Sequence, residues 1–248
     1  MSEDKSPIRS TTPEAIQLAK ALMRTSRYGA LAVLDSLTGR PLASRVAVAT
    51  DVNGTPIILV SGLAAHTPAL IAHPACSLLL GEAGKGDPLA HPRITLHCTA
   101  HKVERNSADY SHTRRRYLNH NPKGSLYVNL GDFVFFRLAV ESASLNGGFG
   151  KAFNLSHADL INSPEIARGI ALSEQDHIDD LNSKLETEIS LHAKRHNEAA
   201  GRWNITSLDP DGFNLSNGDH IIRSHFPVQA DSGDVALKML TGALKTDD

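Results

Sequence analysis

Residues 28–61, YGALAVLDSLTGRPLASRVAVATDVNGTPIILVS, decide the fold. Three runs rich in valine, leucine and alanine, at 28–35, 42–50 and 56–61, are separated by two short segments that contain glycine. The Asn-Gly pair at 53–54 can adopt the positive φ that a tight turn between twisted strands requires. The pattern therefore predicts three successive antiparallel strands joined by hairpins.

Further strand-like runs continue this sheet toward the C-terminus. Residues 75–81 and 91–105 are again apolar or mixed, and GDFVFFRLAVESASL, from Gly131, predicts two more strands. The intervening AAHTPALIAHP has room for only one or two helical turns, which is too short for the usual helix of a parallel crossover. Six or seven antiparallel strands that close on themselves form a small barrel.

Helices are predicted to flank these strands. Thr12 and Pro13 form an N-cap and first-turn pair for a helix. The predicted core face of that helix consists of Ala15, Ile16, Ala19, Leu22 and Met23. A second, polar helix is predicted over 107–120.

A different pattern begins after the segment GGFGKAFNLS. Ser173 is the predicted N-cap of a helix that reaches about residue 198. One face of this helix carries Ile178, Leu181, Leu185, Ile189, His192 and His196. The following WNITSLDPDGFNLSNGDHIIRSHF predicts two or three short strands around Asp-Gly and Asn-Gly turns, and a closing helix is predicted near 231–244.

Composition narrows the range of partners. The 248 residues include 25 basic and 27 acidic side chains, so the formal charge is -2 and the chain has no general attraction to nucleic acid or anionic lipid. The arginine triplet at 114–116 is therefore interpreted as a solvated helix face or a dimer rim. We expect no nucleic-acid partner.

The location and redox state also follow from composition. The polar N-terminus lacks the apolar core of a signal peptide, and nowhere do eighteen apolar residues run together, so we expect a cytoplasmic protein without a membrane partner. Cys76 and Cys98 are the only cysteines. They are expected to be packed thiols in a reducing compartment.

Three motifs carry a resemblance to a known family. They are SGLAAHTPALIAHPACSLLL with the following DPLAHPRITL, then RRRYLNHNPKGSLYVNLGDFVFFRL, then NGGFGKA. In this order they resemble landmarks of the HugZ-type haem-utilisation proteins, a branch of the pyridoxamine-phosphate oxidase-like, FMN-binding split barrels. WNITSLDPDGFNL resembles the C-terminal domain that this branch often carries. The resemblance implies a homodimer whose pocket at the subunit interface binds FMN or haem.

Together, pattern and resemblance predict an α+β chain. It consists of a six- to seven-stranded antiparallel split β-barrel with flanking helices, followed by a small α/β domain. We expect a flexible N-terminus over 1–11, the split-barrel domain over 12–155, a linker over 156–172 and the C-terminal domain over 173–248. Such lengths bury a core without disulfides or a structural metal.

Five residues are candidates for contacts to a cofactor. Arg45 interrupts a small, apolar strand and can grip a phosphate with two hydrogen bonds, and the family has a basic residue near this point. Ser61, His66 and Thr67 follow the third strand and open a short helix, so together with Arg45 they predict a phosphate or propionate site. Lys151 is a further anion contact in the glycine-rich loop.

That loop is not a nucleotide-binding motif. Leu145 and Ala152 occupy positions where a P-loop needs glycine and a hydroxyl residue, and Phe153 occupies the third glycine position of a dinucleotide fingerprint. The glycines are therefore interpreted as a bulge or a close backbone approach.

The thirteen histidines suggest no metal site, because the chain has neither HExxH nor CxxC. His192 and His196, one helical turn apart, are interpreted as a packed or domain-facing pair. His157, His220 and His225 remain single candidates for a haem ligand. The sequence identifies no catalytic residue, because no Ser-His-Asp or Cys-His order stands out.

These observations leave three functions open. The first is a dimeric haem- or flavin-binding split barrel in haem utilisation or oxidative haem degradation. The second is an FMN-dependent oxidoreductase acting on an unknown small molecule. The third is a non-catalytic barrel that has lost its cofactor, because residues 180–185 and the C-terminal TGALKTDD lack histidines that relatives often carry there. Enzymatic activity is therefore left undecided.

Overall fold

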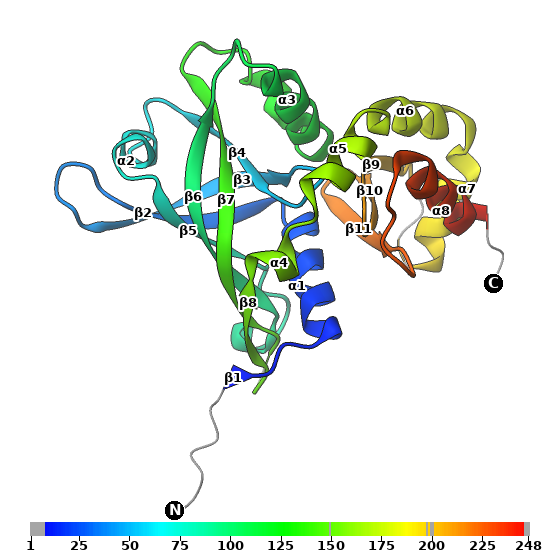
Figure 1. Cartoon of the computed structure of the whole chain (residues 1–248), viewed down its shortest axis with the longest axis horizontal. Coiled ribbons are helices and arrows are strands. Elements are labelled where there is room, and N and C mark those ends of the chain that lie inside the picture. Colours follow the sequence, from blue (N-terminus) through cyan, green and yellow to red (C-terminus); the bar gives the residue numbers. More distant parts are fainter. Residues whose placement is uncertain (1–7, 149, 197, 199–200, 246–248) are drawn as a thin grey trace, which may run out of the picture. The chain divides into compact units, whose positions relative to one another are not determined.

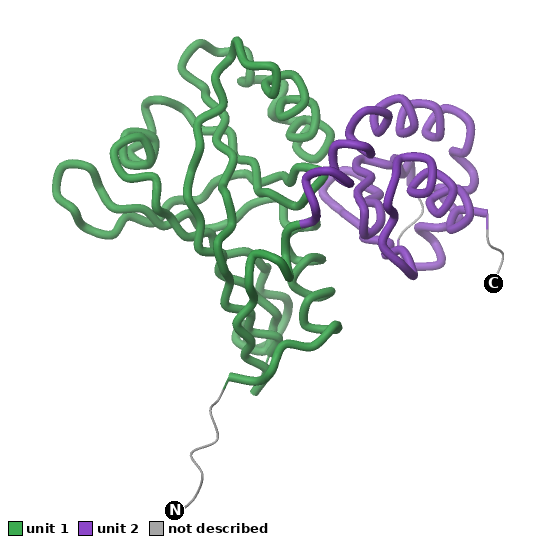
Figure 2. Tube along the Cα trace, in the orientation of Figure 1, with its two compact units in different colours: residues 1–161 green, residues 162–248 purple. Residues whose placement is uncertain are grey.

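The computed structural model divides into two compact units, residues 1–161 and 162–248 (Figure 2). It describes residues 8–245 with the exception of 149, 197, 199 and 200. The expected flexible segment 1–11 therefore falls largely outside the described residues. The segment expected to be a linker, 156–172, contains two helices, since a Ser156–Asp159 capping box starts the first of them.

The first unit contains eight described strands and four α-helices (Figure 1). The strands are β1 (Ile8–Arg9), β2 (Tyr28–Leu34), β3 (Pro41–Thr50), β4 (Pro56–Ser61), β5 (Ala75–Leu80), β6 (Arg93–Val103), β7 (Phe133–Asn146) and β8 (Ala152–Ser156). The helices are α1 (Pro13–Thr25), α2 (His66–Ala72), α3 (Asp109–His120) and α4 (His157–Leu160), with short 3-10 turns at Pro88–Ala90 and Pro122–Leu126.

Six of these strands close into an antiparallel barrel. The order is β7-β4-β3-β2-β5-β6, and β6 pairs again with β7. The two predicted hairpins are confirmed, because β2 pairs with β3 and β3 with β4. Gly54 in the second turn has a φ of 102°, in the left-handed region that glycine tolerates. The predicted α+β class with an antiparallel barrel is therefore confirmed.

The prediction of two strands in the segment from Gly131 is wrong. The structure has one strand there, the 14-residue β7, which runs through both halves of the segment. Its first part pairs with β4 and its last part with β8, while β6 accompanies it along most of its length. The polar ESAS stretch in its middle resembles a turn in the sequence, but it belongs to the continuous ladder.

The barrel core follows from the alternation of side chains along the strands. Inward positions of β2, β5, β6 and β7 are apolar, and α1 adds the buried Ala15, Ala19 and Met23, three members of its predicted face. Phe136 and Leu138 are 1% and 0% exposed. These side chains make a continuous core, which is the main favourable contribution to barrel stability.

The arginine triplet 114–116 was expected on a solvated helix face or a dimer rim, and for Arg116 this expectation is wrong. Only 3% of Arg116 is exposed, and its Nε donates to the carbonyl of Thr50 at 2.9 Å. The neighbouring Asp51 accepts from His112 at 2.7 Å and from Arg137. Burial alone would raise the pKa of Asp51, but these partners hold it well below its ordinary range. Arg116 therefore contributes to a buried polar network.

His120 predicts a pH dependence of barrel stability. Burial lowers its pKa to about 4, although the hydrogen bond with the Ser26 carbonyl opposes this. The unfolded chain binds this proton near pH 6.5, so the contribution to stability is complete above that pH and is lost as the pH falls toward 4. We expect a loss of about 1.4 kcal/mol per pH unit in this window. Denaturant titrations at several pH values give the free energy of unfolding as a function of pH. Between pH 4 and 6.5 this dependence should be smaller by one proton in His120→Gln than in the parent chain. An equal pH dependence of the two chains would contradict this assignment.

The second unit combines helices with a three-stranded antiparallel sheet. Its helices are α5 (Pro164–Ala171), α6 (Glu174–Lys184), α7 (Glu186–Arg195) and α8 (Gly233–Lys245), and its strands are β9 (Asn204–Asp209), β10 (Gly212–Asn217) and β11 (His220–His225). The strand order is β11-β10-β9. The predicted short strands and closing helix are therefore confirmed.

The single helix predicted from Ser173 to about residue 198 is wrong. The chain leaves helical geometry at Leu185, which has φ -122° and ψ 35°, and α6 and α7 are separate helices. The side chain of Asn182 makes two hydrogen bonds to the backbone of Ile205, at 2.7 and 3.0 Å. This attachment holds the last turn of α6 against β9. The helix α7 that follows buries Ile189, His192 and Ala193.

A buried ion pair stabilises the small sheet. Arg223 on β11 donates to both carboxylate oxygens of Asp209 on β9, at 2.6 and 2.8 Å. The side chains are 4% and 0% exposed. Such pairs need good geometry to compensate for the loss of hydration, and the two parallel hydrogen bonds provide it.

Within the described part of the chain, no helix has the length and apolar character needed to cross a membrane.

Candidate functional site

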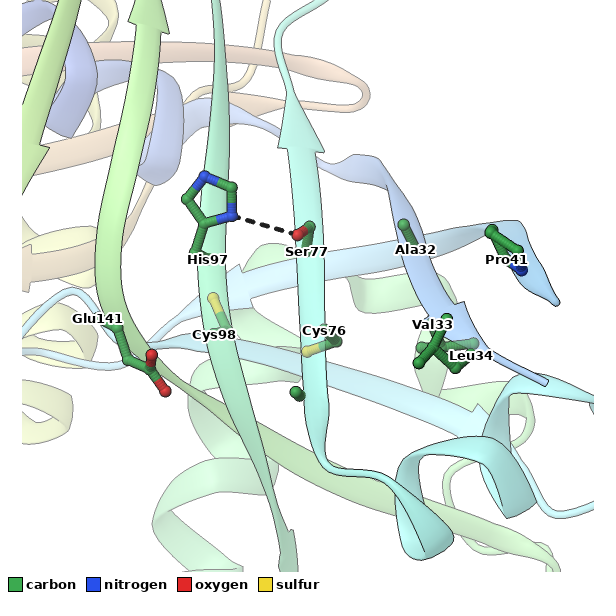
Figure 3. Close-up of a pocket in the computed structure, with 10 residues that line it drawn as sticks. Ala32, Val33, Leu34, Pro41, Cys76, Ser77, His97, Cys98 and Glu141 are labelled. Carbon is green, nitrogen blue, oxygen red and sulfur yellow. Dashed lines mark hydrogen bonds between the residues drawn. The ribbon is translucent and has the colours of Figure 1, made fainter. Parts of the chain in front are cut away.

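A cleft opens in the barrel wall where β2 and β5 separate (Figure 3). The ladder between these strands runs from Ala30–Leu79 to Ala32–Ser77. Beyond it, β2 continues toward its hairpin with β3, while β5 stays paired with β6. The cleft has a volume of about 390 Å³ and is lined by Ala32, Val33, Leu34, Pro41, Ala75, Cys76, Ser77, His97, Cys98 and Glu141.

A β-bulge places a carboxylate beside this cleft. Along the β6–β7 ladder His97 pairs with Ser142, whereas Cys98 pairs with Val140. Glu141 is therefore the extra residue of a bulge on β7, and its exposed side chain lines the cleft. Bulges commonly redirect side chains next to functional sites.

The polar groups of the cleft form two small contacts. Ser77 Oγ and His97 Nδ1 are 3.4 Å apart, as the dashed line in Figure 3 marks. Thr99 Oγ1 donates to Glu141 Oε1 at 2.5 Å. The remaining wall is largely apolar, so the cleft suits a flat apolar ligand with a few polar substituents.

Both cysteines lie at the cleft, and both thiols are free. Cys76 on β5 pairs directly with Cys98 on β6. Burial and the nearby Glu141 carboxylate raise the pKa of Cys76 to about 11, and burial raises that of Cys98 still further. The expectation of packed thiols is confirmed.

His157 lies close to this bulge. It directly follows β8, in which Ser156 pairs with Ser142 of β7. Its Nδ1 donates to the carbonyl of Val140 at 2.7 Å, and the residue is exposed. A backbone carbonyl that accepts from Nδ1 fixes the ring orientation and the tautomer, so Nε2 carries a lone pair directed away from that bond. Histidines that ligate metals commonly have this arrangement.

The structure places Arg45 and Ser61 on neighbouring strands. The β3–β4 ladder pairs Val48 with Ile58, and each of the two candidates lies three residues beyond that rung. The exposed guanidinium of Arg45 lies over the ring of Tyr28, at 5.3 Å from its centroid. Arg45 is therefore on the outer surface of the barrel, where an anion can reach it.

The hydroxyl groups expected to bind phosphate already have partners. Ser61 Oγ donates to the Asp132 carboxylate at 2.6 Å, and Thr67 Oγ1 donates to the Ser61 carbonyl at 2.6 Å. Burial lowers the pKa of His66, which disfavours the charged form of this imidazole. With a carboxylate beside these groups, the cluster does not fit a phosphate as it stands.

Lys151 lies far from that cluster. Ser61 pairs with Phe133 at the start of β7, whereas Asn146 at its end pairs with Ala152. The rise of a β-strand places these two ends about 40 Å apart. The structure of one chain therefore does not bring Lys151 to the other four candidates.

The glycine loop has the geometry that its motif predicts. Gly148 has a φ of 100°, and a Cβ on this residue would lie 2.8 Å from the carbonyl oxygen of Ala90. Gly148 thus permits a close backbone approach. Lys151, next to this loop, lines a separate cavity of about 320 Å³ with Arg9 and Phe153.

The other histidine candidates lie in the second unit. His192 and His196 stack with their ring centroids 4.7 Å apart, and His192 is buried. His220 and His225 are exposed at the two ends of β11. Among the described residues, no three histidine, cysteine or acidic side chains are placed to hold a metal ion together.

The sequence analysis did not identify the cleft. Its members come from five strands, and the local sequence pattern contains no signal for a gap between β2 and β5. The polar residues of the ESAS stretch, within an otherwise apolar strand, are the available indication of the Glu141 bulge.

Comparisons with known proteins assign the barrel to a family. The family model described as "CREG, beta-barrel" matches residues 10–161. Over 117 residues the chain is 39% identical to "Non-canonical heme oxygenase HOZ, chloroplastic" of Arabidopsis thaliana, which covers 46% of this chain and 34% of that protein. The matched region thus spans about a third of the length of that relative.

Solved structures extend the similarity to nearly the whole chain. Atu2129 of Agrobacterium tumefaciens, a protein of unknown function, is 30% identical with a TM-score of 0.80, over 93% of this chain and 96% of that one. A heme binding protein from Mycobacterium smegmatis is 21% identical with a TM-score of 0.56, over 95% of this chain and 100% of that one; at this identity the match concerns the fold alone. These matches confirm the resemblance to HugZ-type split barrels. The chain belongs to the CREG beta-barrel family.

Proposed function

We propose that this protein binds haem in the cleft between β2 and β5, as a homodimer, and supports oxidative haem degradation. The observation that carries the proposal is the geometry of His157, whose Nδ1 donates to the Val140 carbonyl while the side chain remains exposed. The 39% identity to a protein named as a heme oxygenase supports the same ligand class.

The residues present fit a haem. His157, which follows β8 beside the Glu141 bulge, would hold the haem iron through its Nε2. The apolar Ala32, Val33 and Leu34, which line the cleft, would contact the porphyrin. Arg45 is paired with Ala30, which lies two residues from Ala32 on the same outer face of β2. By strand spacing it lies about 8 Å from the cleft, within reach of a propionate. When bound, haem iron supplies the oxygen chemistry, while the protein supplies orientation and a site from which water is restricted.

The outer face of the barrel supports the proposed dimer. Tyr28, Ala30, Ala32 and Leu34 alternate along β2 with their side chains exposed, and Leu79 continues this surface on β5. Tyr28 and Leu34 are 42% and 47% exposed. Contiguous apolar surface of this kind is typical of an interface. A second copy on this face would cover the open side of the cleft and exclude water from it.

The proposal is tested by titrating the full chain with haem and following the Soret band. We expect saturation at one haem per chain, with the mass of a dimer in sedimentation of the loaded protein. Apomyoglobin competition distinguishes a built site from surface adsorption. Failure to retain haem against this competitor at micromolar protein would contradict the proposal.

FMN binding is the alternative that the same experiment resolves. It requires Arg45 and the Ser61 cluster to hold a phosphate, although Ser61 donates to Asp132. Saturable FMN binding that Arg45→Ala abolishes, without a Soret shift, would select a flavin enzyme. Binding of neither ligand would select the non-catalytic barrel. Haem binding that Arg45→Ala weakens would support the propionate contact.

A further inference from the structure

Two thiols occupy one rung of the β5–β6 ladder, an arrangement that the proposed function does not use. Cys76 and Cys98 are direct partners in this antiparallel pair. Two rungs away, the backbone N–H of Ala100 donates to the carbonyl of Pro74 at 2.8 Å. Because hydrogen-bonded and non-hydrogen-bonded rungs alternate, Cys76 and Cys98 also occupy a hydrogen-bonded rung. Such a rung holds the two Cα atoms about 5.5 Å apart, inside the range that a disulfide requires.

The side chains of this pair lie on the same face of the sheet. Both are buried members of the barrel core, and both line the floor of the cleft. Figure 3 shows the sulfur of Cys76 directed toward the strand that carries Cys98. Each thiol is electrostatically influenced by Glu141, and Cys98 also by Cys76, which places the groups close together.

We propose that Cys76 and Cys98 form an oxidisable dithiol, which a peroxide converts into an intramolecular disulfide at the floor of the cleft. This inference does not depend on haem binding. The cross-link would join β5 to β6 at the point where β2 leaves the sheet, and it would fix that edge of the cleft covalently.

The reaction has two steps. Cys76 is the attacking residue, because it is the more exposed of the two, at 9% against 4%, and the more acidic. Its thiolate takes the distal oxygen of hydrogen peroxide, becomes a sulfenic acid and releases hydroxide. The Cys98 thiolate then attacks that sulfur and releases a second hydroxide. With the two thiol protons, the products are one disulfide and two water molecules, and the peroxide accepts two electrons.

The surroundings of this dithiol make its oxidation slow at neutral pH. Glu141 from β7 is the carboxylate facing both thiols, and His97 precedes Cys98 on β6. With the pKa of Cys76 at about 11, the thiolate fraction is small at pH 7. The oxidation rate should rise about tenfold for each pH unit between 7 and 9.

The test oxidises the reduced full chain with hydrogen peroxide under native conditions. Remaining thiols are counted by alkylation in denaturant, and proteolytic peptides are analysed by mass spectrometry without reductant. We expect both thiols to disappear together and a cross-linked peptide pair containing Cys76 and Cys98. Loss of thiols to sulfinic or sulfonic acid without this cross-link would overturn the proposal, as would thiols that survive conditions under which the denatured chain is fully oxidised.

A matched variant checks that the rung is required. Cys98→Ser/Thr99→Cys keeps two thiols on the same strands but moves one to the opposite face, where position 99 pairs with Ala75. We expect at least a tenfold lower yield of cross-linked peptide from this variant, whose folding is verified by its circular dichroism and melting curve. An equal yield would show that the native register does not direct the reaction and would overturn the proposal.

Discussion

Replacement of His157 by alanine is expected to lower haem affinity by at least about 100-fold. Loss of a residue that merely orients a metal ligand already lowers affinity 10- to 100-fold, so loss of the ligand itself should have a larger effect. His157 is exposed, and its side chain makes one described hydrogen bond, to the Val140 carbonyl. The melting temperature of the ligand-free barrel should therefore change little. Soret titration of the variant measures the affinity directly.

His97 provides the matched control. Like His157 it is exposed, and it belongs to the cleft lining itself. Its contact with Ser77 is 3.4 Å long, so the orientation of its ring is less constrained. We expect His97→Ala to retain haem with the Soret position of the parent chain. The reverse pattern, in which His97→Ala loses haem and His157→Ala keeps it, would disprove the assignment of the axial ligand.

Replacement of Arg223 by alanine is expected to destabilise the second unit by about 3–5 kcal/mol, because it removes the positive charge that pairs with the buried carboxylate of Asp209. The single tryptophan, Trp203, is 2% exposed in this unit, so its fluorescence reports unfolding of the unit. Denaturant titration followed at this residue measures the change in the free energy of unfolding.

Two further variants distinguish the effect of the broken ion pair from other effects of substitution on stability. The double variant Asp209→Leu/Arg223→Met removes both buried charges and should recover most of the lost stability. Lys184→Ala breaks an exposed pair with Asp180 and should change stability by less than about 0.5 kcal/mol. A double variant as unstable as Arg223→Ala would show that the packing of Arg223, and not charge, is responsible.

The strands near the N-terminus were predictable because local chemistry encodes them. The glycine at position 54 adopts the positive φ that its turn requires, and the hairpins on either side of β3 follow. Two predictions of element boundaries failed because contacts with distant parts of the chain set those boundaries. β7 remains one strand because β6, β4 and β8 pair with it along its length. The helix predicted from Ser173 to about residue 198 is interrupted at Leu185, next to the point where Asn182 binds the backbone of β9.

The candidate site residues were likewise predictable only in part. Arg45, Ser61, His66 and Thr67 were identifiable by residue type and position, but their partners were not. The hydroxyl of Ser61 donates to Asp132, 71 positions away in the chain. Lys151 lies at the other end of β7 from this group. Residue type indicates what a side chain is able to bind, whereas the groups that compete for it are set by distant parts of the chain.

The antiparallel strands, their turns and the resemblance to the family are readable from the sequence, which also offers three histidines as candidates for the proposed haem ligand. Which surface forms a cleft depends on the tertiary structure. Closure of the barrel opens a gap between β2 and β5, places Cys76 opposite Cys98, and displaces Glu141 in a bulge. Turns depend on neighbouring residues, so a short sequence window specifies them. A cleft depends on strands that meet only when the barrel closes, and no short window contains that information.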